Sequence, residues 1–182
     1  MAAAVALCVL AGGTPTAAAE PGDALHRLVD VAAQRLSTAD PVAAYKWING
    51  GPITDPARVT QVLDAVSADA VGRGIKAPYV QRVFTKQIDA TEGIQYTRFA
   101  QWKFDPALAP TTAPDLSESR SAIDGYNQTM VDEIALHWDS LSGPQCRSDV
   151  DEAVATVIAE RTLDPLYQQA LTAATSSYCD TI

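Results

Sequence analysis

The sequence of 182 residues is 47% hydrophobic and 19% charged, and its 22 acidic residues against 13 Lys and Arg give a formal net charge of −9. This apolar fraction excludes a disordered chain, and an acidic balance without any basic run argues against nucleic acid or an anionic membrane as a partner. We therefore predict one globular domain whose apolar core is large enough to fold without a metal ion.

The first ten residues are apolar and uncharged, and they run through Gly12, Gly13 and Pro15 into three alanines that end at Ala19. This pattern predicts a signal peptide over residues 1–19, a mature domain over residues 20–182, and a protein that is secreted or periplasmic. The apolar run is too short to span a bilayer. It also lacks the usual basic start, which leaves open that translation begins upstream. Cys8 would be removed with this peptide.

Two cysteines, Cys146 and Cys179, remain in the mature chain. In an exported protein an even pair predicts a disulfide, which here would close a loop of about 33 residues and stabilise the fold by about 3 to 4 kcal/mol. The alternative is two buried free thiols. No cluster of His or carboxylate residues accompanies the pair in the sequence to suggest zinc.

Apolar residues recur with helical spacing along the first half of the mature chain. A first helix runs from Leu25 to Asn49, with a kink at Pro41 as an open alternative. Asp55 and Pro56 predict the start of a second helix, which ends near Gly72. Pro78 opens a long third helix that reaches about Trp102.

Three prolines between residues 105 and 114 predict a structureless connector. Asp115 and Glu118 form a capping box for a fourth helix that continues to the turn at Gly143. Two further helices, over about 147 to 162 and 165 to 178, form a hairpin with one of the two late cysteines at each end. Nothing reads as alternating strands, so we predict an all-α single-domain bundle of about six helices.

Familiar catalytic signatures are missing from the sequence. It contains no phosphate-binding loop and no metalloprotease or hydrolase motif, and His26 and His137 are interpreted as surface or capping residues. Arg35 and Lys46, eleven residues apart, would project from one face of an unbroken first helix. Thr91 and Gln95 lie one helical turn apart.

An ordered combination of these residues resembles the all-helical class of chorismate mutases. It consists of Arg35, Lys46, Asp55-x-x-Arg58, and then Tyr79, Arg82 and Phe84 leading into Thr91-x-x-x-Gln95. The exported branch of that class is similar in ADPVAAYKW at 39–47, in Arg98-Phe99, in Trp102-Lys103, and in Ser117-x-x-Arg120-Ser-Ala-Ile-Asp124. That branch also has a cleaved signal and a late cysteine pair, so the resemblance covers nearly the whole mature chain.

The resemblance implies the rearrangement of chorismate to prephenate without metal or cofactor, in a homodimer with each active site inside one protomer. It assigns Arg35 and Arg120 to the two substrate carboxylates and Lys46 to the ether oxygen, with Gln95 facing Lys46 across that oxygen. Arg58 would be a further active-site arginine. Asp55 would lie close to the substrate hydroxyl, and Thr91 would support a carboxylate. Val59 and Val62 depart from relatives that have a polar residue on this face.

Two other functions stay open from the residues alone. An exported helical bundle could hold an anionic ligand in the same cationic pocket without turnover, or the chain could be a structural module with solvated arginines. The pair Lys46 and Gln95 favours the enzyme, because a pocket that only binds carboxylates does not need two donors aimed at an ether oxygen.

Overall fold

The computed structural model describes residues 23–181, so the predicted signal peptide lies outside the described residues. Within this range the regular structure is helical and contains no strand, which confirms the all-α prediction. The helices are α1 (Asp23–Ser37), α2 (Ala39–Asn49), α3 (Pro56–Gly72), α4 (Ala77–Phe104), the 3₁₀ turn η1 (Pro106–Leu108), α5 (Leu116–Leu136), α6 (Trp138–Ser142), α7 (Cys146–Glu160) and α8 (Pro165–Thr175).

The predicted first helix is divided in two, and the break lies at Thr38 rather than at Pro41. A proline has no N–H to donate to the carbonyl four residues earlier, and its ring crowds that carbonyl. For Pro41 this position is Ser37, the last residue of α1. The chain adapts with a tighter turn, in which the N–H of Thr38 donates to the carbonyl of Arg35 at 3.2 Å.

The predicted fourth helix is also divided, at His137, into α5 and the short α6. The connector after α4 is not structureless as predicted, because η1 begins in it at Pro106. The side chain of Asp105 accepts a hydrogen bond from the N–H of Ala107 at 3.1 Å and so stabilises this turn.

Aspartates begin three of the helices, because a carboxylate satisfies N–H groups that have no partner inside the first turn. Asp55 accepts from the N–H of Arg58 at 3.1 Å, Asp115 from that of Ser117 at 2.7 Å, and Asp164 from that of Tyr167 at 2.9 Å. The helix starts predicted at Asp55 and Asp115 are therefore confirmed.

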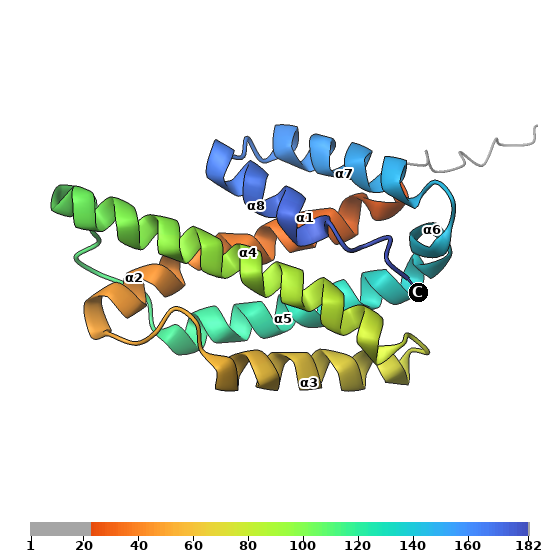
Figure 1. Ribbon diagram of the computed structural model, residues 1–182, viewed down its shortest axis with the longest axis horizontal. Coiled ribbons are helices and arrows are strands. Elements are labelled where there is room, and N and C mark those ends of the chain that lie inside the picture. Colours follow the sequence, from red (N-terminus) through yellow and green to blue (C-terminus); the bar gives the residue numbers. More distant parts are fainter. Residues whose placement is uncertain (1–22, 182) are drawn as a thin grey trace, which may run out of the picture.

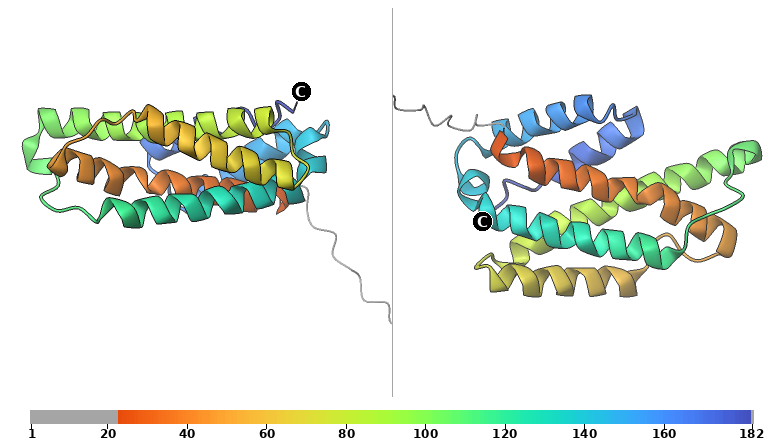
Figure 2. Two further views of the ribbon diagram at one scale, coloured as in Figure 1. Left: turned by 90° about the horizontal axis from the view of Figure 1, so that it is seen from below. Right: turned by 180° about the vertical axis from the view of Figure 1, so that it is seen from behind.

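The long helix α4 packs against α2, α3 and α8, whereas α1 packs against α5, α7 and α8 (Figures 1 and 2). The predicted apolar stripe of α1 lies in the core, where its members have no exposed surface: Leu25, Leu28, Val29, Ala32 and Leu36. Figure 1 shows the hairpin of α7 and α8 on the opposite side of the bundle from α3.

A disulfide joins Cys146 to Cys179, as predicted, with 5.8 Å between the two Cα atoms. It links the start of α7 to the chain just after α8. The preceding residue, Tyr178, is fully buried, and its carbonyl accepts a hydrogen bond from the hydroxyl of Tyr79 at 2.7 Å. The bridge therefore holds the C-terminal end of the chain against the core.

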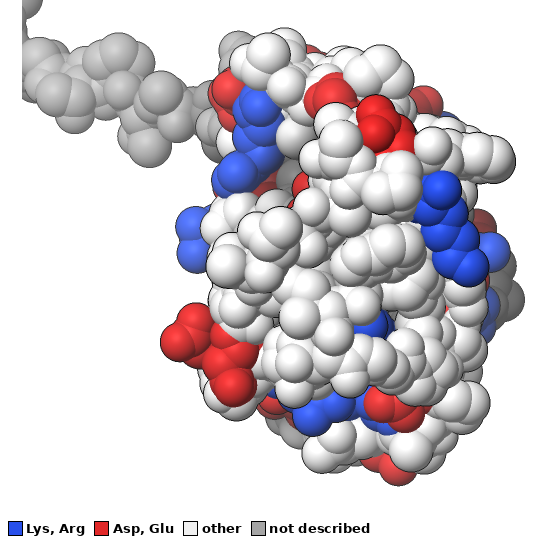
Figure 3. Space-filling model, turned by 90° about the vertical axis from the view of Figure 1, so that its left-hand side faces the viewer, with Lys and Arg blue, Asp and Glu red and all other residues white. Residues whose placement is uncertain are grey.

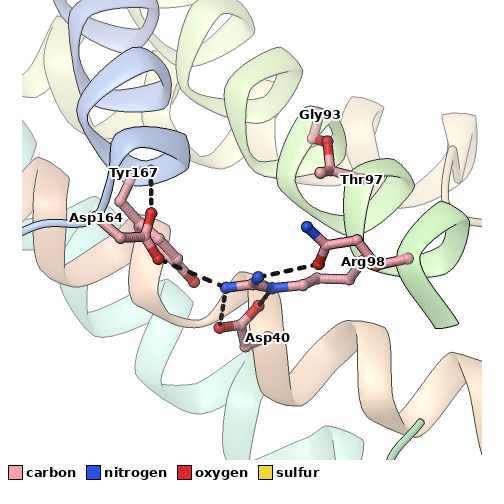
Figure 4. A network of polar contacts seen from close by, with 7 residues as sticks. Asp40, Gly93, Thr97, Arg98, Asp164 and Tyr167 are labelled. Atoms are coloured by element: carbon pink, nitrogen blue, oxygen red, sulfur yellow. Dashed lines mark hydrogen bonds and ion pairs between the residues drawn. The ribbon is translucent and has the colours of Figure 1, made fainter. Parts of the chain in front are cut away.

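Two sets of contacts hold α2 on its neighbours. Asp40 accepts from Nε of Arg98 at 2.7 Å, and the same guanidinium lies 3.8 Å from Asp164 at the start of α8 (Figure 4). Further along α2, Trp47 packs edge-on against Phe99 and Trp102, with ring centroids 5.2 and 5.5 Å away. These contacts give a structural role to Arg98, Phe99 and Trp102, and they position Lys46.

Among the described helices, none combines the length and the apolar composition that crossing a bilayer requires.

Candidate active site

One cavity, of about 650 Å³ including the space at its mouth, lies between α1, α2, α3, α4 and α5. All seven residues that the sequence predicted for substrate binding line it: Arg35, Lys46, Asp55, Arg58, Thr91, Gln95 and Arg120. The rest of the lining is mostly apolar: Val42, Ile53, Val59, Val62, Ile88, Leu116 and Ile123, with Glu92 as the exception. Arg35 and Lys46 therefore line the same cavity, although the break at Thr38 places them on different helices.

Arg35 is only 3% exposed and lies at the inner side of the cavity. Its Nε donates to Oδ1 of Asn127 at 2.7 Å, and its Nη1 donates to Oγ1 of Thr91 at 3.2 Å. The Thr91 hydroxyl in turn donates to the carbonyl of Gln87 at 2.7 Å, so its oxygen is available as an acceptor. Burial lowers the pKa of Arg35 to about 10, so the side chain is still a cation at neutral pH.

Lys46 reaches into the cavity from α2 and is half-buried. Its Nζ donates to the carbonyl of Ile53 at 2.9 Å and to Oε1 of Gln95 at 3.2 Å. Burial lowers the pKa of Lys46 more than the nearby carboxylates of Glu92 and Asp55 raise it. Because Gln95 accepts through its oxygen, its amide nitrogen is left as a donor.

The other two cations lie nearer to solvent. Arg58 donates to Oδ1 of Asp124 at 2.6 Å and to Oε1 of Gln61 at 2.9 Å. Arg120 is exposed on α5 and lines the same cavity. Together with Arg35 and Lys46, they surround the cavity with four positive charges in a molecule whose net charge is −9. Screening over about 8 Å at physiological salt makes these near charges outweigh the distant surface.

Three side chains of this region were given no site role from the sequence, although Asp124 ends one of the motifs that carry the family resemblance. Glu92 lines the cavity, and its Oε2 accepts from the hydroxyl of Thr54 at 2.6 Å. Asn127 contacts Arg35, and Asp124 pairs with Arg58. A partial signal was present, because Asp124 and Asn127 follow Arg120 by four and seven residues and so share its helix face.

The polar lining of the cavity consists of four cations, the amide of Gln95, the hydroxyl of Thr91 and the carboxylates of Asp55 and Glu92. This set of groups is suited to an anionic ligand rather than to a metal ion. In the described part of the chain, His, Cys, Asp and Glu nowhere gather in a group of three that could hold a metal.

Comparison with known proteins identifies the family. A family model described as chorismate mutase type II matches residues 26–96. A secreted chorismate mutase of Mycolicibacterium smegmatis is 57% identical over 180 residues, which are 98% of this chain and 99% of that protein. The chain belongs to the chorismate mutases. A secreted chorismate mutase of Mycobacterium tuberculosis is 50% identical over 93% of this chain and 85% of its own.

The fold agrees with this assignment. The crystal structure of a chorismate mutase from Burkholderia thailandensis superposes with a TM-score of 0.81 and 33% identity, covering 86% of this chain and 99% of that one. The family and the isomerase activity predicted from the sequence are therefore confirmed: the chain is an enzyme with chorismate mutase activity.

Proposed function

We propose that the cavity is the active site, in which chorismate rearranges to prephenate. One C–O bond breaks as one C–C bond forms within the same molecule, so no group leaves and no electron is exchanged with the protein. The enzyme has only to hold the substrate in a compact conformation and to stabilise the charge that builds on the ether oxygen. Cations and hydrogen-bond donors are sufficient for this task.

The observation that carries the proposal is the convergence of Lys46 and Gln95. The two side chains come from different helices and meet at 3.2 Å inside the cavity. An ether oxygen seated between them would accept from the ammonium group of Lys46 and from the amide nitrogen of Gln95. Both groups meet charge that develops as the C–O bond breaks, so both stabilise the transition state more than the bound substrate.

Arg35 and Arg120 would hold the two substrate carboxylates, with Thr91 supporting the first. A guanidinium offers a planar pair of donors that matches a carboxylate. Arg58 would join them by exchanging Asp124, its present partner, for the substrate. The apolar walls of the cavity exclude water and strengthen these charge interactions.

Asp55 would lie near the substrate hydroxyl. Its Oδ1 already caps α3, which leaves the second carboxylate oxygen for a ligand. Val59 and Val62 line the same wall and offer no polar partner, so this hydroxyl must be held from other sides of the cavity.

Replacement of Lys46 by alanine tests the proposal. We expect Lys46→Ala to fold normally and to lose about 10²-fold or more in kcat, with a smaller change in KM, because one preorganised donor to the developing charge is removed. Lys86→Ala removes the same charge from an exposed position of α4 and serves as the control. The assay follows the loss of the diene absorbance of chorismate by the purified protein.

Two outcomes would contradict the assignment of this cavity. One is a Lys46→Ala variant that stays within about threefold of the wild type, which is far below the expected loss. The other is a wild-type protein that binds chorismate stoichiometrically without consuming it, which would mean an anion-binding protein instead of an enzyme.

We also propose that the chain is exported after cleavage behind Ala19. Relatives named secreted, and the disulfide between Cys146 and Cys179, support this proposal. Sequencing the N-terminus of the protein recovered outside the cytoplasm tests it. A protein that keeps residues 1–19 would contradict it.

The family resemblance leads us to propose a homodimer. Phe104 and Leu108 are 91% and 65% exposed. They end α4 and η1, and the C-terminal end of α4 lies on the left in Figure 1. Figure 3 faces this side of the molecule, whose central surface is largely uncharged around a hollow in which a Lys or Arg is visible. A second copy could bury these side chains. Sedimentation equilibrium measures the mass, and a monomer at micromolar concentration would contradict the proposal.

A further inference from the structure

Arg35 is held in a way that differs from most arginines of this protein. At least five of the other eight arginines in residues 23–181 pair with carboxylates, among them Arg27 with Glu133, Arg58 with Asp124 and Arg98 with Asp40. Both side-chain partners of Arg35 are instead neutral, namely the Asn127 amide and the Thr91 hydroxyl. Arg35 is also the one Lys or Arg in the described range that is fully buried.

A buried cation without a counterion is costly, because it loses its hydration and gains no opposite charge. The surrounding charges do not remove this cost. Arg58 repels Arg35, and the attraction of Asp124 is weaker than the effect of burial on the pKa of Arg35. A carboxylate at the position of Asn127 would supply the missing counterion. The chain has an uncharged amide there.

We propose that Asn127 is a positioning residue that fixes the guanidinium of Arg35 while leaving its charge unpaired for the substrate. This inference rests on the proposed function, in which Arg35 binds a substrate carboxylate. Asn127 lies outside the cavity lining, on the α5 side of Arg35, and is 6% exposed. It therefore acts on the substrate only through Arg35.

The geometry explains why an amide serves better than an acid. A guanidinium has five N–H donors, and the bonds to Asn127 and Thr91 use two of them. The remaining three can receive a carboxylate from the cavity. With aspartate at position 127, a buried ion pair would form before the substrate arrives. The substrate carboxylate would then have to share Arg35 with a second, nearby negative charge.

Asn127→Asp separates this role from a merely structural one, because its effects on stability and on binding have opposite signs. Supplying a counterion to Arg35 should leave the melting temperature unchanged or raise it. The KM for chorismate should rise by about 10- to 100-fold, as expected for one added charge close to a charge-binding group, with a smaller change in kcat. The binding of prephenate, measured by calorimetry, should weaken in parallel.

Gln128→Glu is the matched control. It adds the same single negative charge at the next position of α5, on an exposed side chain that is not part of the cavity. Its KM should stay within about threefold of the wild type, since a solvated charge at this distance is screened. A similar rise in KM for both variants would show that net charge alone is responsible, and would overturn the inference.

Asn127→Leu keeps the test decisive if Asn127→Asp does not fold. It keeps the branched shape and the number of non-hydrogen atoms, keeps the site neutral and removes the acceptor that orients Arg35. We expect kcat/KM to fall about tenfold or more. Kinetics within threefold of the wild type in a folded variant, for either substitution, would overturn the inference.

Failure of this inference can be told apart from failure of the proposed function. If Arg35→Lys impairs the enzyme but both Asn127 variants do not, Arg35 binds substrate without help from Asn127. If Arg35→Lys also behaves as the wild type, the assignment of the cavity itself is wrong.

Discussion

Gln95→Glu is the most informative single change at the proposed centre, because it alters charge at one atom position with almost no change in shape. Gln95 is 4% exposed, and its Oε1 lies 3.2 Å from Nζ of Lys46. A carboxylate at this distance from the ammonium group would be attracted by about 5 kcal/mol at an effective dielectric constant of 20. This attraction lowers the pKa of the new carboxyl group, whereas its burial and the neighbouring Glu92 raise it.

The ionised variant should be a poor enzyme. Its carboxylate cannot donate to the ether oxygen, and it places a negative charge beside an oxygen that is itself becoming negative. Loss of one such donor typically costs about 10²-fold or more. Protonation restores a donor, so kcat/KM should rise about tenfold for each pH unit of acidification until the pKa of the carboxyl group is reached. The wild type, with an amide, should be nearly flat from acid to neutral pH.

The assay is kcat/KM for chorismate against pH, with the folded fraction of each protein measured at every pH. Gln81→Glu provides the control, since it makes the same change at an exposed position of α4. If Gln95→Glu kept wild-type activity at neutral pH and showed no gain on acidification, Gln95 would not contact the reacting oxygen. The mechanism would then lose one of its two central donors.

Three further predictions follow from the same geometry. Arg35→Lys should lower kcat/KM by about tenfold or more, because a point charge cannot replace a bidentate fork; unchanged steady-state kinetics would mean that Arg35 does not contact the substrate. Reduction of the disulfide between Cys146 and Cys179 should lower the melting temperature by about 10 °C, because the bridge contributes about 3 to 4 kcal/mol through loop closure. Activity measured well below that temperature should change little. A calorimetric scan that is identical with and without reductant would refute this prediction. Because burial lowers the pKa of Lys46, wild-type kcat/KM should begin to fall on the alkaline side below the ordinary lysine value. Between the pKa values of Lys46 in the folded and the unfolded chain, the unfolded chain binds more protons, so Lys46 makes the fold more stable as pH rises. Circular dichroism should therefore show a folded protein at a pH where activity is already falling. Coincident loss of fold and activity would contradict this reasoning.

Local chemistry in the sequence was sufficient to locate most helices. Asp55 with Pro56, and Asp115, are groups that satisfy free N–H donors at a helix start, and the structure uses both in that way. The two breaks at Thr38 and His137 were harder to predict. Proline weakens a helix over the whole preceding turn, and the sequence by itself does not say at which residue of that turn the chain will bend. At His137 no proline or glycine marks the end of α5.

The sequence by itself determined the family and the chemical types of the groups. An ordered set that includes Arg35, Lys46 and Gln95 was recognisable because those types recur at fixed spacings. Only the tertiary structure decided how they are partnered. Asn127 lies 92 residues from Arg35 along the chain, and Gln95 lies 49 residues from Lys46. Such contacts depend on how α1 and α2 cross α4 and α5, which is set by packing of the whole core and not by any local pattern. For that reason the neutral partner of Arg35, which decides whether its charge is available to a substrate, became visible only in the folded molecule.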